Sequence, residues 1–259
     1  MKIYILCDME GTSGIWRHEQ VASSSPHYQE GRQLLMGDVN AAIAGAMDGG
    51  ATELVVCDTH AMGWNFRLSE MDGRAEYETP THACPMPSLD ESFAGLILTG
   101  HHAMAGTRDG FLDHTMSPDH WFRFRINGQE VGEIGMETAH AGHFDVPLIM
   151  LTGDEAACRE AEGLRPGIVT VPVKRGLGRS RAHCLPPERG RALIRERAAK
   201  AVGMAKELPP WKPDTPITLE LTLTRSDYAD QAAAADGVER VDARTVRKSV
   251  ASADRVWRF

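Results

Sequence analysis

Three short apolar runs, each ending in polar side chains, constrain the fold of this chain more than any other feature. They are KIYILCD at 2–8, ELVVCD at 53–58 and GLILTGHH at 95–102. Runs of this length that stop at a turn are typical of strands buried on both faces of a parallel sheet. A helical periodicity over residues 28–47, ended by DGG, separates the first two runs. This alternation predicts an α/β fold with a mostly parallel sheet flanked by helices.

The remaining sequence predicts further elements of the same kinds. HWFRFRINGQEVGEIG alternates around Asn127-Gly128, which indicates a hairpin, and Glu133 opens a helix toward Phe144. We expect strands in PLIMLTGD, GIVTVPVKRG and ITLELTLT, a helical block from Pro187 to Leu208, and a short capped helix in SLDESFAG. The Pro-rich stretch at 208–216 predicts a boundary. Residues 1–207 would then form the metal-binding α/β catalytic region, and 208–259 a C-terminal strand and helix portion that completes the fold.

Charge and cysteine content narrow the class of protein. Twenty-eight Lys and Arg against 36 Asp and Glu give a net charge of −8, which argues against nucleic-acid and anionic-membrane partners. The Arg-rich stretch 175–197 is better explained as a solvated helix face. The five cysteines are odd in number and lack CxxC spacing, so we expect free thiols and a reducing cytoplasm. No apolar run approaches the ~20 residues of a membrane span.

The three strand ends predict a metal site. In open parallel sheets, ligands bind beyond the carboxyl ends of the strands, so side chains distant in sequence converge there. Carboxylates and imidazoles without thiolates suit zinc, manganese or iron in a hydrolytic site. The excess of carboxylates suggests two ions roughly 3.5–4 Å apart with a hydroxide between them. The side chains concerned are Asp8 and Glu10, Asp58 and His60, and His101 and His102.

Several motifs of this chain resemble those of the D-aminopeptidase family, the dinuclear zinc peptidases first described from a bacterial dipeptide-transport operon. The similarity runs in order from residue 1 to about residue 200. The matching segments are DMEGTSG (8–14), CDTHAMGWN (57–65), LTGHHAM (98–104), DHTM (113–116) and GQEVGEIGMETAHAGHFDVP (128–147).

The resemblance implies a specific set of site residues and two Zn²⁺ per chain. Asp8 would bridge the ions, with Glu10 and His60 on one, and His102 and Glu133 on the other. His114 matches the catalytic histidine proposed for the family. The resemblance also implies a second, smaller α/β portion and a homo-oligomer, a homodecamer around a channel.

Some neighbouring residues keep two interpretations at this point. Asp58 is either a hydrogen-bond acceptor that fixes the tautomer of a ligand histidine or a cap of its turn. His101 is expected to point away from His102, because successive strand residues face opposite sides. Glu137 and His140 share one helix face with Glu133, either as a rival metal site, as ordinary helix polarity or as residues that support the metal ligands.

The predicted activity is zinc-dependent hydrolysis of the N-terminal amide bond of short peptides, with D-amino-acid peptides as candidate substrates. His114 would act as a proton donor, as a hydrogen-bond donor to the tetrahedral intermediate or as a nucleophile. Two other classes remain open. One is a dinuclear hydrolase of another amide or ester, and the other is a non-catalytic, metal-stabilised binding protein.

Overall fold

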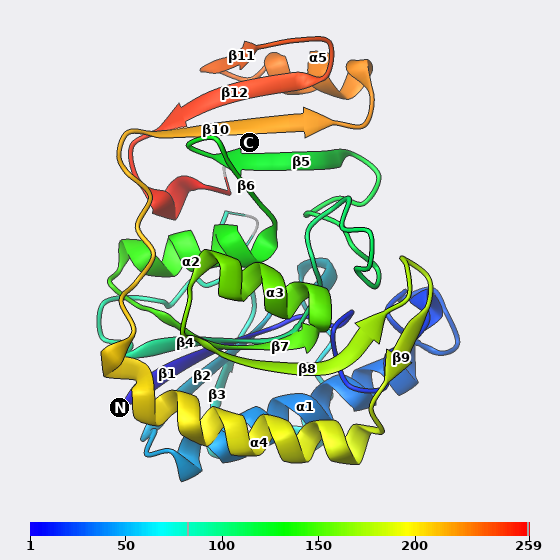
Figure 1. The fold of residues 1–259 in the computed structure, drawn as a ribbon, viewed down its shortest axis with the longest axis vertical. Coiled ribbons are helices and arrows are strands. Elements are labelled where there is room, and N and C mark those ends of the chain that lie inside the picture. The colour runs from blue at the N-terminus through cyan, green and yellow to red at the C-terminus, as the bar shows by residue number, and fades with distance from the viewer. Residues whose placement is uncertain (82, 258) are drawn as a thin grey trace.

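Two sheets organise the chain in this computed structural model, which describes residues 1–81, 83–257 and 259 (Figure 1). The larger sheet has the strand order β3-β2-β1-β4-β7-β8-β9, in which only the β8–β9 pair is antiparallel. Its strands are β1 (Lys2–Cys7), β2 (Glu53–Asp58), β3 (Glu76–Glu78), β4 (Gly95–His101), β7 (Leu148–Asp154), β8 (Val169–Gly176) and β9 (Ala182–Cys184).

The smaller sheet is antiparallel, with the order β11-β12-β10-β5-β6. It draws strands from the middle of the chain and from its C-terminal part, and the division of the chain at 207/208 stays a prediction. Its strands are β5 (Trp121–Ile126), β6 (Gln129–Val131), β10 (Ile217–Leu223), β11 (Val238–Arg240) and β12 (Thr245–Val250).

Helices cover both faces of the larger sheet, which confirms the predicted α/β class. Figure 1 shows α1 and α4 side by side below this sheet, with α2 and α3 between the two sheets. The helices are α1 (Tyr28–Asp48), α2 (Glu133–His143), α3 (Glu155–Leu164), α4 (Pro187–Met204) and α5 (Ser226–Ala233). Short 3₁₀ turns lie at η1 (His18–Gln20), η2 (His60–Met62), η3 (Leu68–Glu70), η4 (Ala205–Glu207) and η5 (Ala253–Arg255). Among the described helices, none has both the length and the apolar character needed to cross a membrane.

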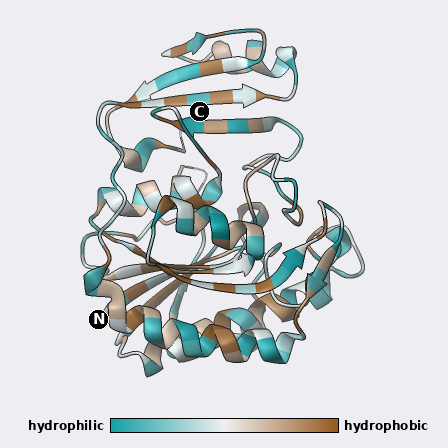
Figure 2. Cartoon of the chain, in the orientation of Figure 1, coloured by the Kyte–Doolittle hydropathy of each residue, from teal (hydrophilic) through white to brown (hydrophobic). Residues whose placement is uncertain are grey.

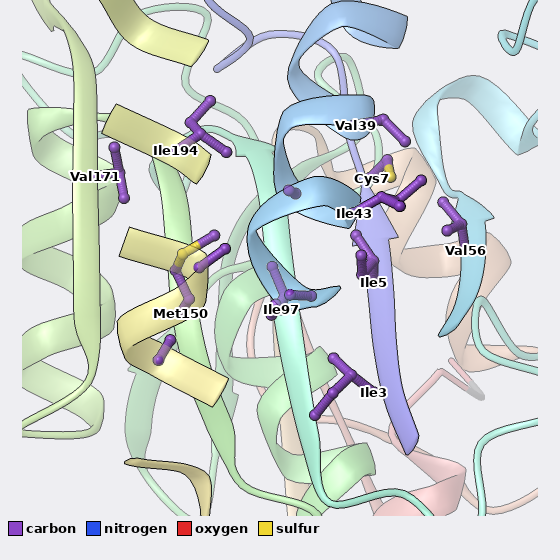
Figure 3. Packing of buried hydrophobic residues seen from close by; sticks show 14 of the residues in the cluster. Ile3, Ile5, Cys7, Val39, Ile43, Val56, Ile97, Met150, Val171 and Ile194 are labelled. Atoms are coloured by element: carbon purple, nitrogen blue, oxygen red, sulfur yellow. The ribbon is translucent and has the colours of Figure 1, made fainter. Parts of the chain in front are cut away.

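The burial of β1 explains why its sequence is apolar at every position. Ile3, Ile5 and Cys7 face α1 and α4, where they pack with Val39, Ile43 and Ile194 (Figure 3). The alternate residues Tyr4 and Leu6 belong to the core beneath α2 and α3. Since both faces are covered, no position of the strand favours a polar side chain.

Strand β10 shows the opposite pattern, because only one face of the smaller sheet is covered. Ile217, Leu219 and Leu221 are buried, while Thr218 and Glu220 between them are partly exposed. Figure 2 shows this alternation of hydropathy along the strand. The period of two predicts a strand with one buried face, and that face shares its core with Met136 and Ala139 of α2.

The predicted hairpin is confirmed, with Asn127 at φ 50° and Gly128 at φ 82° between β5 and β6. The predicted short helix in SLDESFAG is wrong, since residues 88–94 form turns that lead into β4. The Asp90 side chain accepts a hydrogen bond from the Ser92 backbone N–H at 2.9 Å. Such a local bond competes with helical hydrogen bonding. All five cysteines are free thiols, as expected.

Candidate metal centre

The register of the larger sheet places the three predicted strand ends together. Strand β1 lies between β2 and β4, and Cys7 is paired with Asp58 on one side and with Thr99 on the other. The chain segments that follow all three strands therefore leave the sheet at one edge. This is the edge at which parallel sheets bind their ligands.

Two glycines allow these segments to approach closely. The Asp8 backbone N–H donates to the Thr99 carbonyl at 2.8 Å, and the Gly11 N–H donates to the Gly100 carbonyl at 2.7 Å. Gly100 has φ +72°, and a Cβ there would lie 2.1 Å from the Asp8 carbonyl oxygen. A side chain at Gly100 would push the Asp8 turn away from the end of β4.

The six residues predicted for the site converge at this edge. Their ligand atoms form two groups, each with its atoms within 4.8 Å of one another. The first group is Asp8, Glu10 and His60, and the second is His102, His114 and Glu133. Asp8 joins the two, because its Oδ1 lies 3.1 Å from His60 Nδ1 and its Oδ2 lies 3.2 Å from His102 Nε2. Their assignment as zinc ligands stays a prediction.

The remaining contacts complete the cluster. Glu10 Oε2 lies 3.1 Å from His60 Nδ1, on the Asp8 side of the ring. Glu133 Oε1 lies 3.6 Å from His102 Nε2 and 3.7 Å from His114 Nε2. The His102 and His114 rings are stacked, with centroids 3.9 Å apart and planes 13° from parallel. The structure thus places His114 next to the predicted ligands rather than apart from them.

The three histidines share one hydrogen-bonding arrangement. In each ring, the nitrogen that points away from the cluster contacts a backbone carbonyl oxygen. The pairs are His60 Nε2 with Val21 O at 3.0 Å, His102 Nδ1 with Ala103 O at 3.0 Å and His114 Nδ1 with Leu112 O at 2.9 Å. A carbonyl oxygen only accepts, so the nitrogen facing it carries the proton. In a neutral ring, the lone pair of the other nitrogen then points toward the carboxylates.

This arrangement fits a bound cation. Lone pairs that face carboxylate oxygens at 3.1–3.2 Å repel them unless a proton or a metal ion lies between. Asp8 Oδ2 is buried and makes no hydrogen bond to the described residues. Buried polar atoms without a partner are rare in proteins, and a bound ion can serve as the partner of such an atom. Carboxylate oxygens and imidazole nitrogens are also the donors that catalytic zinc prefers.

Protons and a cation compete for this cluster. Burial alone would raise the pKa of Asp8, but the His102 and His60 rings that face its carboxylate hold that pKa well below its usual range. Burial alone would lower the pKa of His60, but Glu10 and Asp8 raise it well above the ordinary value. Acid should therefore displace a metal ion from this cluster.

The loop that carries His114 is tightly constrained. Leu112 and Met116, on either side, have φ values of 52° and 57°, which non-glycine residues rarely adopt. The Met116 backbone N–H donates to Glu133 Oε1 at 2.6 Å, and the Asp113 carboxylate accepts from the Gly106 N–H at 2.7 Å. The loop backbone thus orients Glu133 as well as His114.

The structure resolves the two interpretations of Asp58. Its carboxylate accepts hydrogen bonds from the backbone N–H groups of His60 at 3.2 Å and Asn65 at 2.6 Å. Asp58 is therefore the cap of its turn, and the Val21 carbonyl fixes the His60 tautomer. Sequence spacing gives no signal for Val21, because a backbone carbonyl is available at every residue.

His101 points away from the cluster, as expected. Its Nε2 lies 2.8 Å from Glu137 Oε2, and both side chains are buried. Burial by itself would lower the pKa of His101, but the Glu137 charge raises it to about 9. Among the described residues, no potential metal-holding group includes Glu137 or His140, and the rival helical metal site gains no support.

Lys174 is a site residue that sequence reasoning missed. Its Nζ donates to the Glu10 and Ile15 carbonyls, both at 2.6 Å. Lys174 is 3% exposed, and burial lowers its pKa to about 8. It ties the loop carrying Glu10 to β8. The one available signal was a lysine that directly follows the largely apolar run VTVPV.

A cavity of about 510 Å³ opens on the cluster. Asp8, Glu10, His60, His114 and Glu133 all reach it. Apolar side chains supply much of the remaining wall, from segments that are far apart in the sequence. They include Val21, Met62, Pro80, Met116 and Trp257.

Comparison with known proteins gives consistent results. A family model described as D-aminopeptidase matches residues 1–259. The D-aminopeptidase of Bacillus subtilis (strain 168) is 32% identical over an alignment of 243 positions, which covers 92% of this chain and 87% of that protein. The solved structure of the Zn-dependent D-aminopeptidase DppA from Bacillus subtilis, described as a self-compartmentalizing protease, superposes with a TM-score of 0.95 at 31% identity. That match covers 99% of this chain and 94% of the other.

Proposed function

Because this chain belongs to the D-aminopeptidase family and is a peptidase, we propose that it is a zinc-dependent aminopeptidase. It would hydrolyse the amide bond after the first residue of short peptides and prefer a D-residue there. The observation that carries the proposal is the arrangement of His60, His102 and His114. Each has its distal nitrogen on a backbone carbonyl and its other nitrogen directed at carboxylates.

We propose two zinc ions per chain, held by the predicted ligands. Glu10 and His60 would hold one ion, His102 and Glu133 the other, and the two oxygens of Asp8 would divide between them. The separation of the Asp8 contacts, Oδ1 toward His60 and Oδ2 toward His102, supports this division. When bound, the ions would supply an activated water as the nucleophile and polarise the scissile carbonyl.

His114 is the proposed proton carrier. Its Nδ1–H is held by the Leu112 carbonyl, so Nε2 is free to take a proton and to return it to the leaving amine. Stacking on His102 and the contact with Glu133 fix the ring against the cluster. An acid–base residue placed this way contributes about 10²–10⁴-fold in rate.

The decisive experiment combines metal analysis with kinetics. Wild-type protein should contain two zinc ions per chain, cleave D-aminoacyl amides and dipeptides faster than their L-counterparts, and lose activity on chelation. His114→Gln should retain both ions and lose kcat by about 10²-fold or more. If His114→Gln loses one zinc ion, His114 is a ligand; if it keeps full activity, it has no catalytic role. Tight zinc without turnover of any amide would favour a binding protein.

We also propose a homo-oligomer, and specifically a homodecamer, because the related DppA is described as a self-compartmentalizing protease. Large apolar side chains on the surface of this chain support association, since they include Trp64 at 79% and Leu68 at 82% exposure. Sedimentation equilibrium should give a mass near ten times 28.4 kDa. A monomer at micromolar concentration would contradict this.

A further inference from the structure

Four carboxylate side chains line the cavity, and the metal centre accounts for three of them. Asp8, Glu10 and Glu133 belong to the clustered ligand atoms, whereas Glu137 belongs to neither group. Glu137 is 1% exposed, so a charge on its carboxylate is costly unless a partner compensates it.

The partner that compensates Glu137 occupies only one of its oxygens. His101 Nε2 lies 2.8 Å from Glu137 Oε2, and His101 Nδ1 lies 3.1 Å from the Thr99 carbonyl. No hydrogen bond to Glu137 Oε1 occurs among the described residues. His101 therefore fixes the carboxylate in one orientation and leaves Oε1 for a ligand with hydrogen-bond donors.

Helix geometry sets the distance between Glu137 and the metal centre. Glu133 and Glu137 are four residues apart on α2, so they share one face with their Cβ atoms about 5–6 Å apart. In an aminoacyl group, the amine nitrogen and the carbonyl oxygen are joined by three bonds of about 1.46, 1.52 and 1.23 Å. A carbonyl oxygen at the Glu133 end thus leaves the amine of the same residue within reach of Glu137.

His140, on the next turn of α2 after Glu137, contacts two side chains of the cavity wall. His140 Nδ1 accepts from Trp257 Nε1 at 3.1 Å, and His140 Nε2 lies 3.5 Å from Cys84 Sγ. Both Cys84 and Trp257 line the cavity. A residue attached to the amine would meet this wall of Cys84, His140 and Trp257.

We propose that Glu137, oriented by His101, binds the ammonium group of the substrate's first residue, and that the wall of Cys84, His140 and Trp257 excludes any residue before it. This proposal rests on the proposed aminopeptidase function and identifies what makes the site an exopeptidase site. The carboxylates of the cavity also suit an ammonium group, because among the described residues that line the cavity there is no Lys or Arg.

The test measures binding and turnover separately. D-Alaninol carries the amine and no scissile bond, so its Kd for the zinc-loaded protein, from isothermal titration calorimetry, does not depend on catalysis. Glu137→Gln should raise this Kd at least tenfold and leave the zinc content unchanged. It should also reduce, at least tenfold, the ratio of kcat/KM for D-alanine p-nitroanilide to that for its N-acetyl derivative. Glu137→Asp should restore part of both effects.

A matched control is available in Glu160, a partly buried carboxylate outside the cavity that accepts from the Met104 N–H at 2.8 Å. Glu160→Gln should lower Tm without changing the selectivity ratio. An unchanged Kd for D-alaninol in Glu137→Gln would overturn the amine subsite. Tight, Glu137-dependent binding of D-alaninol without amide hydrolysis would support the subsite and refute the proposed peptidase reaction.

Discussion

Protonation of His140 should make this protein progressively less stable below pH 6.5. His140 is 3% exposed, and it accepts from Trp257 Nε1–H through Nδ1, so the ring is neutral. Burial lowers its pKa to about 4, with smaller effects from the charged neighbours Asp254 and His143. In the unfolded chain, the same imidazole has a pKa of about 6.5. As pH falls, the unfolded state therefore takes up the proton first.

The size of the effect follows from the two pKa values. Neutral His140 contributes fully to the unfolding free energy above pH 6.5, and this contribution is lost as the pH falls toward 4. A difference of about 2.5 pKa units corresponds to about 3 kcal/mol of unfolding free energy in full. At pH 5.5 the loss should be about 1.4 kcal/mol.

Urea denaturation of zinc-free wild type and His140→Asn measures this directly. The Asn side chain can still accept from Trp257, but it does not titrate. The variant should be less stable than wild type at pH 8, and this gap should shrink by about 1.4 kcal/mol at pH 5.5. The other titrating groups are present in both proteins, so their contributions to the pH dependence of stability cancel in the comparison. If both proteins lose stability in parallel between these pH values, His140 does not remain neutral in the folded state and the reasoning is refuted.

Two further outcomes are expected. Lys174→Met leaves the Glu10 and Ile15 carbonyls without their buried donor. It should weaken zinc affinity by about 10–100-fold in a chelator competition assay. Unchanged affinity would show that the loop carrying Glu10 keeps its position without the Lys174 ammonium. Removal of zinc by a chelator should lower Tm by about 10 °C, because a metal at a thousandfold excess over its Kd stabilises by about 4 kcal/mol; a constant Tm after verified zinc loss would contradict folding-coupled binding.

The sequence allowed most of the large sheet to be predicted, because burial on both faces leaves a continuous apolar run. It also located the three strand ends that carry Asp8, Glu10, His60 and His102, since parallel strands must end at one edge, but only the family resemblance separated His60 and His102 from their neighbours Asp58 and His101. Glu133 lies at the start of a helix, not at a strand end, so only the family resemblance identified it. The wrong helix at SLDESFAG reflects a local competition, in which Asp90 bonds to the Ser92 backbone.

The contacts that support the site could not be predicted from the sequence, for a different reason. Lys174 reaches Glu10 across 164 residues of chain, and Trp257 reaches His140 across 117. Such contacts depend on how β8 and the C-terminal segment pack, which no local pattern encodes. Side-chain acceptors could be guessed from spacing, as for Asp58, but the actual acceptor for His60 is a main-chain carbonyl.

The use of main-chain carbonyls has a consequence for how this centre tolerates mutation. In many metal sites the residue that orients a histidine is itself a side chain, and one substitution removes it. Here the orienting oxygens belong to the backbone of Val21, Ala103 and Leu112. No amino-acid replacement at these positions deletes the acceptor, so their side chains are free to vary with the packing around them. Divergence or redesign of the metal preference must therefore act through the predicted ligands themselves or through the path of the backbone.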